Sequence, residues 1–153
     1  FGASKEIMDN VAPVGAVYQA GTLSGNPVAM AAGKAQLEQC LENGFYLDLE
    51  SKASNLVSGI MGHVTGKGYA VKLFSIGSIF WIAFTDRPSI RSASEIDPES
   101  MKIFSSFYHA LLDNGIYTGP SGYEVGFVSA AHSDADIDEA IVAFNRSLDI
   151  AFA

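Results

Sequence analysis

Several features that would define a function class are scarce in this sequence. Cysteine occurs once, as Cys40, so the chain can form neither an internal disulfide nor a zinc site built from several thiolates. Positive charge is also scarce, because 9 Lys and Arg stand against 17 Asp and Glu, a formal net charge of −8 at pH 7. Such an acidic balance argues against binding to nucleic acid or to an anionic membrane surface. The sequence therefore predicts neither nucleic-acid nor membrane partners.

Long apolar runs are lacking as well. The longest run, residues 79–84, has the length of a strand and falls short of the ~18 residues that suggest a membrane span. The first residues contain no signal-peptide pattern and no initiator Met, so we expect the chain to begin inside a longer protein. The single cysteine favours a reducing compartment. We predict a cytoplasmic location, or the plastid stroma if the source is a plant or an alga.

Apolar residues are abundant instead, at 48% of the 153 residues, which suffices for a sizeable core. Hydrophobic spacing and capping residues predict four helices, over 27–42, over 46–61, from Asp97-Pro98-Glu99 onward, and after Ser133. Residues 62–68 are expected to end the second helix. The β-branched and aromatic stretch 69–85, interrupted by Gly77-Ser78, predicts a hairpin, and a strand is expected near 125–130. The predicted fold class is α+β, with helices on one face of a small antiparallel or mixed sheet.

The most natural boundary in the chain is Asn43-Gly44, a helix stop that follows a long Ala-rich helix. We therefore predict two parts, residues 1–43 and residues 44–153.

One polar stretch, "QAGTLSGNP" at residues 19–27, leads directly into that Ala-rich helix. Ser and Asn are common helix caps, so a capped turn is one interpretation. Glycines that allow close approach, hydroxyl groups and a helix N-terminus also suit an anion, so a phosphate-binding loop is the other. The residues alone leave both open.

Other polar residues carry weaker signals. His63, His109 and His132 lack the spacing of metal ligands, so each is predicted to be structural and no metal site is predicted. Glu124 lies among glycines and aromatics in "PSGYEVG", just before an apolar strand. It is either an exposed loop residue or a carboxylate that points into a cleft.

Two long stretches resemble one enzyme family. "YQAGTLSGNPVAMAAG" at 18–33 and "GIYTGPSGYEVGFVSAAHSDADID" at 115–138 resemble glutamate-1-semialdehyde 2,1-aminomutases, which are class III pyridoxal-phosphate aminotransferases. The resemblance implies a homodimer of the aspartate-aminotransferase fold (fold type I) that uses pyridoxal 5'-phosphate (PLP). It implies that glutamate-1-semialdehyde is converted to 5-aminolevulinate, the precursor of tetrapyrroles. Residues 1–43 would end the large PLP domain, and residues 44–153 would form the small C-terminal domain.

The resemblance also implies roles for three residues. Gly21 and Thr22 correspond to the pair that binds the phosphate of the neighbouring subunit's cofactor. Glu124 lies near the place where related transaminases hold a substrate carboxylate with an arginine, and its negative charge would favour an amine end. The Schiff-base lysine of the family precedes Phe1, and Lys5 is not its counterpart. We therefore expect no catalytic residue in this chain, and no activity from the chain by itself.

Two loops depart from the family pattern. Ala3 stands where the family more often has a glycine, and Thr118-Gly119 stand where it more often has an apolar residue followed by Ala or Pro.

Two alternatives remain: another class III enzyme that acts on an ω-amino group, or a free-standing, non-catalytic ligand-binding domain.

Overall fold

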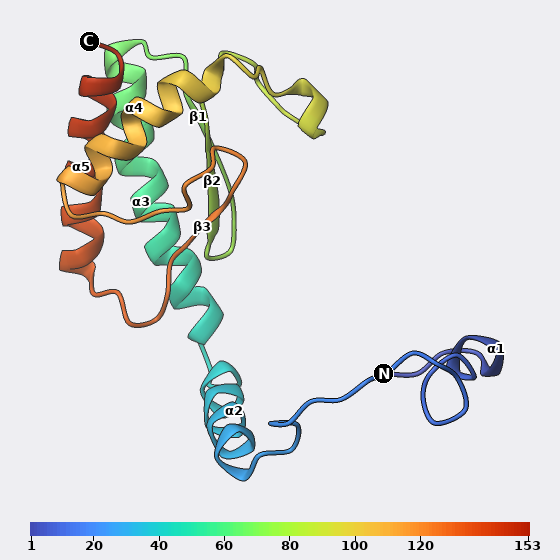
Figure 1. Cartoon of the computed structure of the whole chain (residues 1–153). Helices are drawn as coiled ribbons and strands as arrows, with labels where there is room; N and C mark the ends of the chain where they lie inside the picture. The colour runs from blue at the N-terminus through green and yellow to red at the C-terminus, as the bar shows by residue number, and fades with distance from the viewer. The chain divides into compact units, whose positions relative to one another are not determined.

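A computed structural model describes residues 1–153, and these divide into two compact units, 1–41 and 42–153. The first unit contains the short helix α1 (Lys5–Met8) and the helix α2 (Pro27–Cys40), joined by a long loop (Figure 1). The sequence did not predict α1. None of the residues of α2 is buried within this unit.

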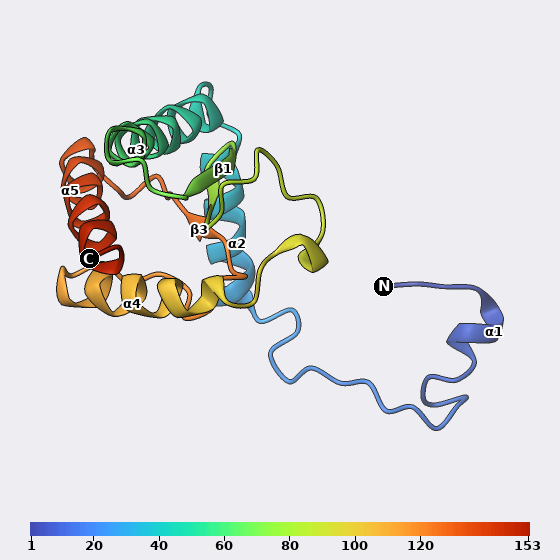
Figure 2. The same ribbon diagram turned by 90° about the horizontal axis from the view of Figure 1, so that it is seen from above.

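The second unit is the predicted α+β domain. Its elements are α3 (Phe45–Lys67), β1 (Lys72–Ile76), β2 (Ile79–Ala83), the 3-10 helix η1 (Ala93–Glu95), α4 (Ser100–Asp113), β3 (Gly126–Phe127) and α5 (Asp134–Ala151). The three strands form an antiparallel sheet in the order β1-β2-β3, and α3 packs against β1 and β2 while α5 packs against α3 and α4. The helices α3, α4 and α5 lie to one side of the sheet (Figure 2).

The core of this unit forms between the sheet and the helices. Side chains alternate along β2, so that Phe80 and Ile82 face the helices and are buried. Phe107 of α4 is 1% exposed, and its ring meets those of Phe84 and Phe144 edge-to-face at 5.5 Å and 5.6 Å between centroids. Edge-to-face geometry is an arrangement that aromatic rings prefer, so the abundant phenylalanines help to fix how α4 and α5 pack.

Several predicted boundaries were wrong, beginning with α2, which ends at Cys40 rather than at residue 42. Helix α3 runs on to Lys67 because Val64 continues its buried face, and it ends where Gly68 takes a left-handed φ of 72°. Helix α4 begins at Ser100, since Asp97 and the two residues after it form a preceding turn in which Asp97 Oδ1 accepts the Glu99 N–H at 3.0 Å. The last strand is confined to the two residues of β3 that pair with β2.

The predicted cap of the last helix is confirmed. Ser133 Oγ accepts the Asp136 N–H at 3.2 Å, and Asp136 Oδ2 accepts the Ser133 N–H at 2.7 Å. This reciprocal pair is a capping box, which satisfies two N–H groups that the first turn of a helix leaves without partners.

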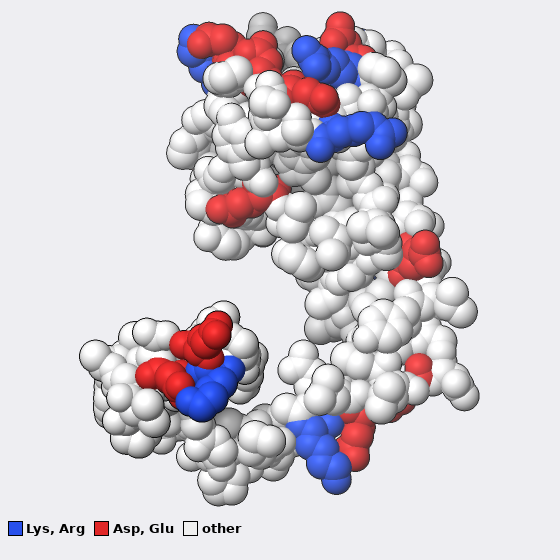
Figure 3. Space-filling view, turned by 90° about the vertical axis from the view of Figure 1, so that its right-hand side faces the viewer, with Lys and Arg blue, Asp and Glu red and all other residues white.

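Charged side chains gather toward one end of the larger unit on the face drawn in Figure 3, where Lys and Arg lie beside Asp and Glu. No extended basic patch is visible on that face (Figure 3). None of the helices combines the length and the hydrophobicity needed to cross a bilayer.

Candidate functional site

The polar stretch before α2 forms a tight turn. The Ser24 N–H donates to Gly21 O at 2.9 Å, and the Asn26 N–H donates to Leu23 O at 3.0 Å. A Cβ atom at Gly21 would clash with Ser24 Oγ, so a side chain at this position would require the Ser24 hydroxyl to rotate away. Thr22 in this turn is exposed, and its hydroxyl has no hydrogen-bond partner within the chain.

The structure separates the two interpretations of this stretch. Asn26 is the cap of α2, because its Oδ1 accepts the N–H groups of Val28 at 3.0 Å and of Ala29 at 3.2 Å. The donors at the start of the helix are therefore occupied by the chain's own side chain. An anion bound here would therefore find its donors in the preceding turn rather than at the helix N-terminus.

Glu124 lies at the end of a second turn, in the larger unit. Its backbone N–H donates to Ser121 O at 3.0 Å, and the side chain is exposed. The carboxylate folds back over Gly119, where an added Cβ would lie 2.9 Å from Glu124 Cβ and would clash with Oε2. Gly119, where the family that the sequence resembles more often has Ala or Pro, thus leaves the space that the Glu124 side chain occupies.

Two contacts hold the loop that leads to Glu124. Trp81 of β2 donates its indole N–H to Gly122 O at 2.8 Å. Gly122 is buried, and a Cβ atom there would lie 2.7 Å from Met101 Sδ. The loop therefore approaches α4 so closely that only glycine fits at this position without a shift of its neighbours.

An open cavity of about 650 Å³ lies beside this loop. Its wall includes Gly119 and the residues of β3, together with His132 just before α5 and Asp136 in its first turn. Thr118 Oγ1, also in the wall, is buried without a hydrogen-bond partner. Gly119 is thus shared between the cavity and the contact with Glu124.

The predicted residues fall in separate units. Gly21 and Thr22 belong to residues 1–41, and Glu124 belongs to residues 42–153. The structure describes the local geometry of each, and the phosphate role of Gly21 and Thr22 and the substrate role of Glu124 stay predictions.

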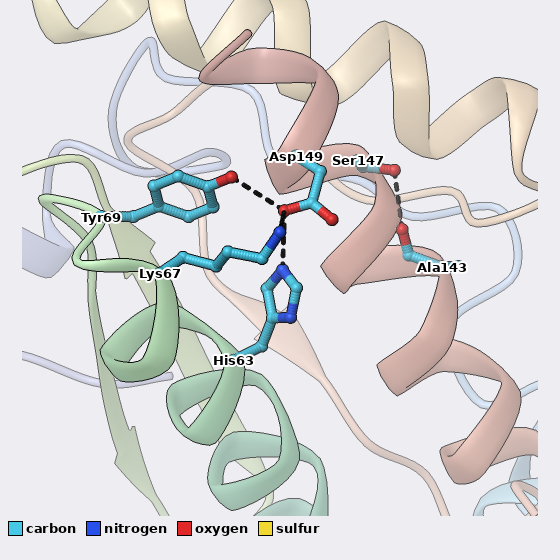
Figure 4. Close-up of polar contacts among 6 residues, drawn as sticks. All are labelled: His63, Lys67, Tyr69, Ala143, Ser147 and Asp149. Carbon is cyan, nitrogen blue, oxygen red and sulfur yellow. Dashed lines mark hydrogen bonds and ion pairs between the residues drawn. The ribbon is translucent and has the colours of Figure 1, made fainter.

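A polar cluster that the sequence did not reveal joins α3 to α5 (Figure 4). Asp149 Oδ1 accepts the Tyr69 hydroxyl at 2.8 Å, lies 2.8 Å from His63 Nε2, and lies 3.3 Å from Lys67 Nζ. The hydrogen bond from Tyr69, followed by those from His63 and Lys67, lowers the pKa of Asp149 to about 2. The same hydrogen bond raises the pKa of Tyr69, since ionised Tyr69 would lose it. The i,i+4 spacing of His63 and Lys67 was the available signal, but Asp149 lies 86 positions from His63 and 80 from Tyr69.

This cluster ties two helices together and has no features of a metal site. No group of three or more His, Cys, Asp or Glu side chains is placed to hold a metal ion. His132 instead accepts the Ser129 N–H at Nδ1, 3.0 Å away, and Ser147 of α5 satisfies its buried hydroxyl by donating to Ala143 O at 2.8 Å (Figure 4). These groups stabilise the fold locally.

The sequence matches no protein-family model. Its fold, however, is similar to solved transaminases. An omega-transaminase from Sphaerobacter thermophilus superposes with a TM-score of 0.75 at 24% identity, over 99% of this chain and 35% of that chain. The chain has the fold of a segment of a fold type I aminotransferase.

Two further aminotransferase-fold structures are similar. A transaminase with PLP bound superposes with a TM-score of 0.69 at 24% identity, over 88% of this chain and 30% of that chain. A glutamate-1-semialdehyde aminomutase from Pseudomonas aeruginosa, in complex with PMP, gives a TM-score of 0.70 at 18% identity, over 90% of this chain and 31% of that chain. The chain thus spans about a third of the length of these enzymes.

Proposed function

We propose that this chain is part of a PLP-dependent class III aminotransferase, and specifically of a glutamate-1-semialdehyde 2,1-aminomutase that forms 5-aminolevulinate. The observation that carries the proposal is the likeness of 99% of the chain to part of a transaminase. The aminomutase assignment is supported by the motifs at 18–33 and 115–138 and by a carboxylate, Glu124, in the loop before the last strand.

The cofactor proposal rests on the turn at Gly21 and Thr22. PLP, when bound, supplies the electron sink for amino transfer, and its phosphate presents acceptor oxygens. The exposed Thr22 hydroxyl has no hydrogen-bond partner within the chain, and Gly21 beside it carries no side chain that would hold a ligand away from the backbone. These residues fit a phosphate group, while the capping role of Asn26 keeps the adjacent helix end occupied.

Thr22→Ala in the full-length enzyme tests this role. A hydrogen bond to a charged group contributes about 1.5–3 kcal/mol, so PLP should bind about 10- to 150-fold more weakly. PLP titration of the apoenzyme, followed by absorbance, measures the change. Ser24→Ala in the same turn is the matched control and should retain the wild-type affinity. Equal affinities for Thr22→Ala and the wild type would remove Thr22 from the site.

We further propose a homodimer in which this turn contributes to the partner's cofactor site. If so, PLP should be released at the same protein concentration at which dilution separates the subunits. Analytical ultracentrifugation and PLP absorbance, measured over one dilution series, compare the two transitions. PLP that stays bound to separated subunits would place the phosphate contacts within one subunit.

Glu124 is proposed to select the amine-bearing end of the substrate. Its exposed carboxylate attracts an ammonium group and repels an α-carboxylate. Glu124→Gln keeps the shape and removes the charge, so KM for the amine substrate should rise by about 5-fold, the factor for an exposed ion pair of about 1 kcal/mol. Unchanged kinetics would refute the role.

The product of the full-length enzyme distinguishes the aminomutase from the other candidates. An aminomutase converts glutamate-1-semialdehyde to 5-aminolevulinate without an added amino acceptor, because the amino group returns to the same carbon skeleton. An ω-aminotransferase would require a keto-acid acceptor and would leave glutamate-1-semialdehyde unrearranged. A protein that binds no PLP would instead be the non-catalytic domain.

A further inference from the structure

Trp81 lies outside the hydrophobic core, so packing of the core does not account for its position. It lies on the face of β2 opposite to the buried Phe80 and Ile82, and it is paired across the hairpin with Phe74. The two rings stack at 5.6 Å with an interplanar angle of 23°. Trp81 is only partly buried, and its side chain reaches from the sheet to the loop that precedes β3.

The indole N–H makes the one hydrogen bond between residues 119–124 and the rest of the chain. Its acceptor is Gly122 O at 2.8 Å, whereas the other hydrogen bonds of this loop, to Ser121, stay inside it. Gly122 in turn lies against Met101 and Phe104 of α4, so the loop is held between the sheet and a helix. Glu124 follows Gly122 by two positions, so its placement depends on this anchor.

We propose that Trp81 is a positioning residue for Glu124, and that it sets the selectivity of the site for amine-bearing substrates. This inference rests on the proposed function. Trp81 itself touches neither the carboxylate nor, by the proposal, the substrate. It fixes the backbone at Gly122, and Gly119 leaves the space into which the Glu124 carboxylate folds.

The test uses the full-length PLP-loaded enzyme and four single variants. Trp81→Phe keeps an aromatic ring and removes the hydrogen-bond donor. Trp81→Leu removes the donor with a smaller side chain and serves in its place if Trp81→Phe fails to fold. Gly119→Ala displaces the Glu124 carboxylate directly and leaves the Trp81 hydrogen bond in place. Phe74→Leu removes the stacked ring but keeps the indole N–H, and it is the matched control.

Trp81→Phe should raise KM for the amine substrate about 2- to 5-fold, with little change in kcat, because a residue that acts through Glu124 has at most the effect of removing the Glu124 charge. Amide hydrogen exchange in the peptide that covers 119–124 should become faster. Gly119→Ala should raise KM without faster exchange, and Phe74→Leu should change neither by more than about twofold.

The decisive measurement is the double variant of Trp81→Phe with Glu124→Gln. If Trp81 acts through Glu124, removing the donor has no further effect on KM once the carboxylate charge is gone. Effects that multiply, or faster loop exchange with an unchanged KM, would overturn the inference and leave the proposed function intact. A wild-type enzyme without aminotransferase or aminomutase activity would overturn both, so the two failures are distinguishable.

Discussion

Helices α3 and α5 approach each other closely at Gly59, and this contact allows a sharp test of the packing. A Cβ atom at Gly59 would lie 2.6 Å from Ile141 Cδ1 and 2.9 Å from both Cγ1 and Cγ2. Because both Cγ atoms are in the way, rotating the Ile141 side chain exchanges one close contact for another. An alanine at this position therefore requires the helices to move apart.

The expected size of the effect follows from two opposing contributions. Alanine in place of glycine inside a helix stabilises by about 1 kcal/mol, whereas overpacking a core contact costs about 1–3 kcal/mol. Gly59→Ala should therefore change the free energy of unfolding by between about 0 and −2 kcal/mol. Gly62 of the same helix has open space where a Cβ would stand, with nothing within 4 Å, so Gly62→Ala should stabilise by about 1 kcal/mol.

Urea unfolding followed by circular dichroism measures both variants, and the difference between them isolates the clash at about 1–3 kcal/mol. Ile141→Ala removes the obstructing atoms, so Gly59→Ala should become stabilising in that background. Equal stabilisation by Gly59→Ala and Gly62→Ala in the wild-type chain would refute the close approach of the two helices.

Two further predictions concern electrostatics and capping. The folded pKa of Asp149, about 2, lies below the ordinary value of 3.8, so its charge stabilises the fold above pH ~4, and that stability is lost as the pH falls toward 2. In acid-unfolding experiments, the free energy of unfolding of Asp149→Asn should depend less on pH between pH ~4 and ~2 than that of the wild type. The same pH dependence in both proteins would contradict the cluster in Figure 4. Ser133→Ala removes half of the capping box of α5 and should lower the free energy of unfolding by about 0.5–2 kcal/mol in urea, with no loss being the contrary result.

The predicted site was accessible to sequence reasoning only in part. The residues around Gly21 and Thr22 left a phosphate turn and a capped turn both open, and the structure assigns the capping role to Asn26, while the phosphate role, implied by the resemblance, stays a prediction. The substrate role of Glu124 came from the resemblance and stays a prediction, and the contact that holds its loop was not predicted. Trp81 lies 41 positions before Gly122, and no local pattern signals a hydrogen bond across that separation.

Local interactions determined what the sequence alone could reveal. Alternation along β2, the turn at Gly77-Ser78 and the Ser133 cap depend on residues a few positions apart, so the α+β class, the hairpin and the start of α5 were predictable. The polar cluster of Asp149 and the anchor at Trp81 join residues 41 to 86 positions apart. The tertiary structure alone decided them, because a hydrogen bond between distant residues forms only once packing of the core has brought their elements together.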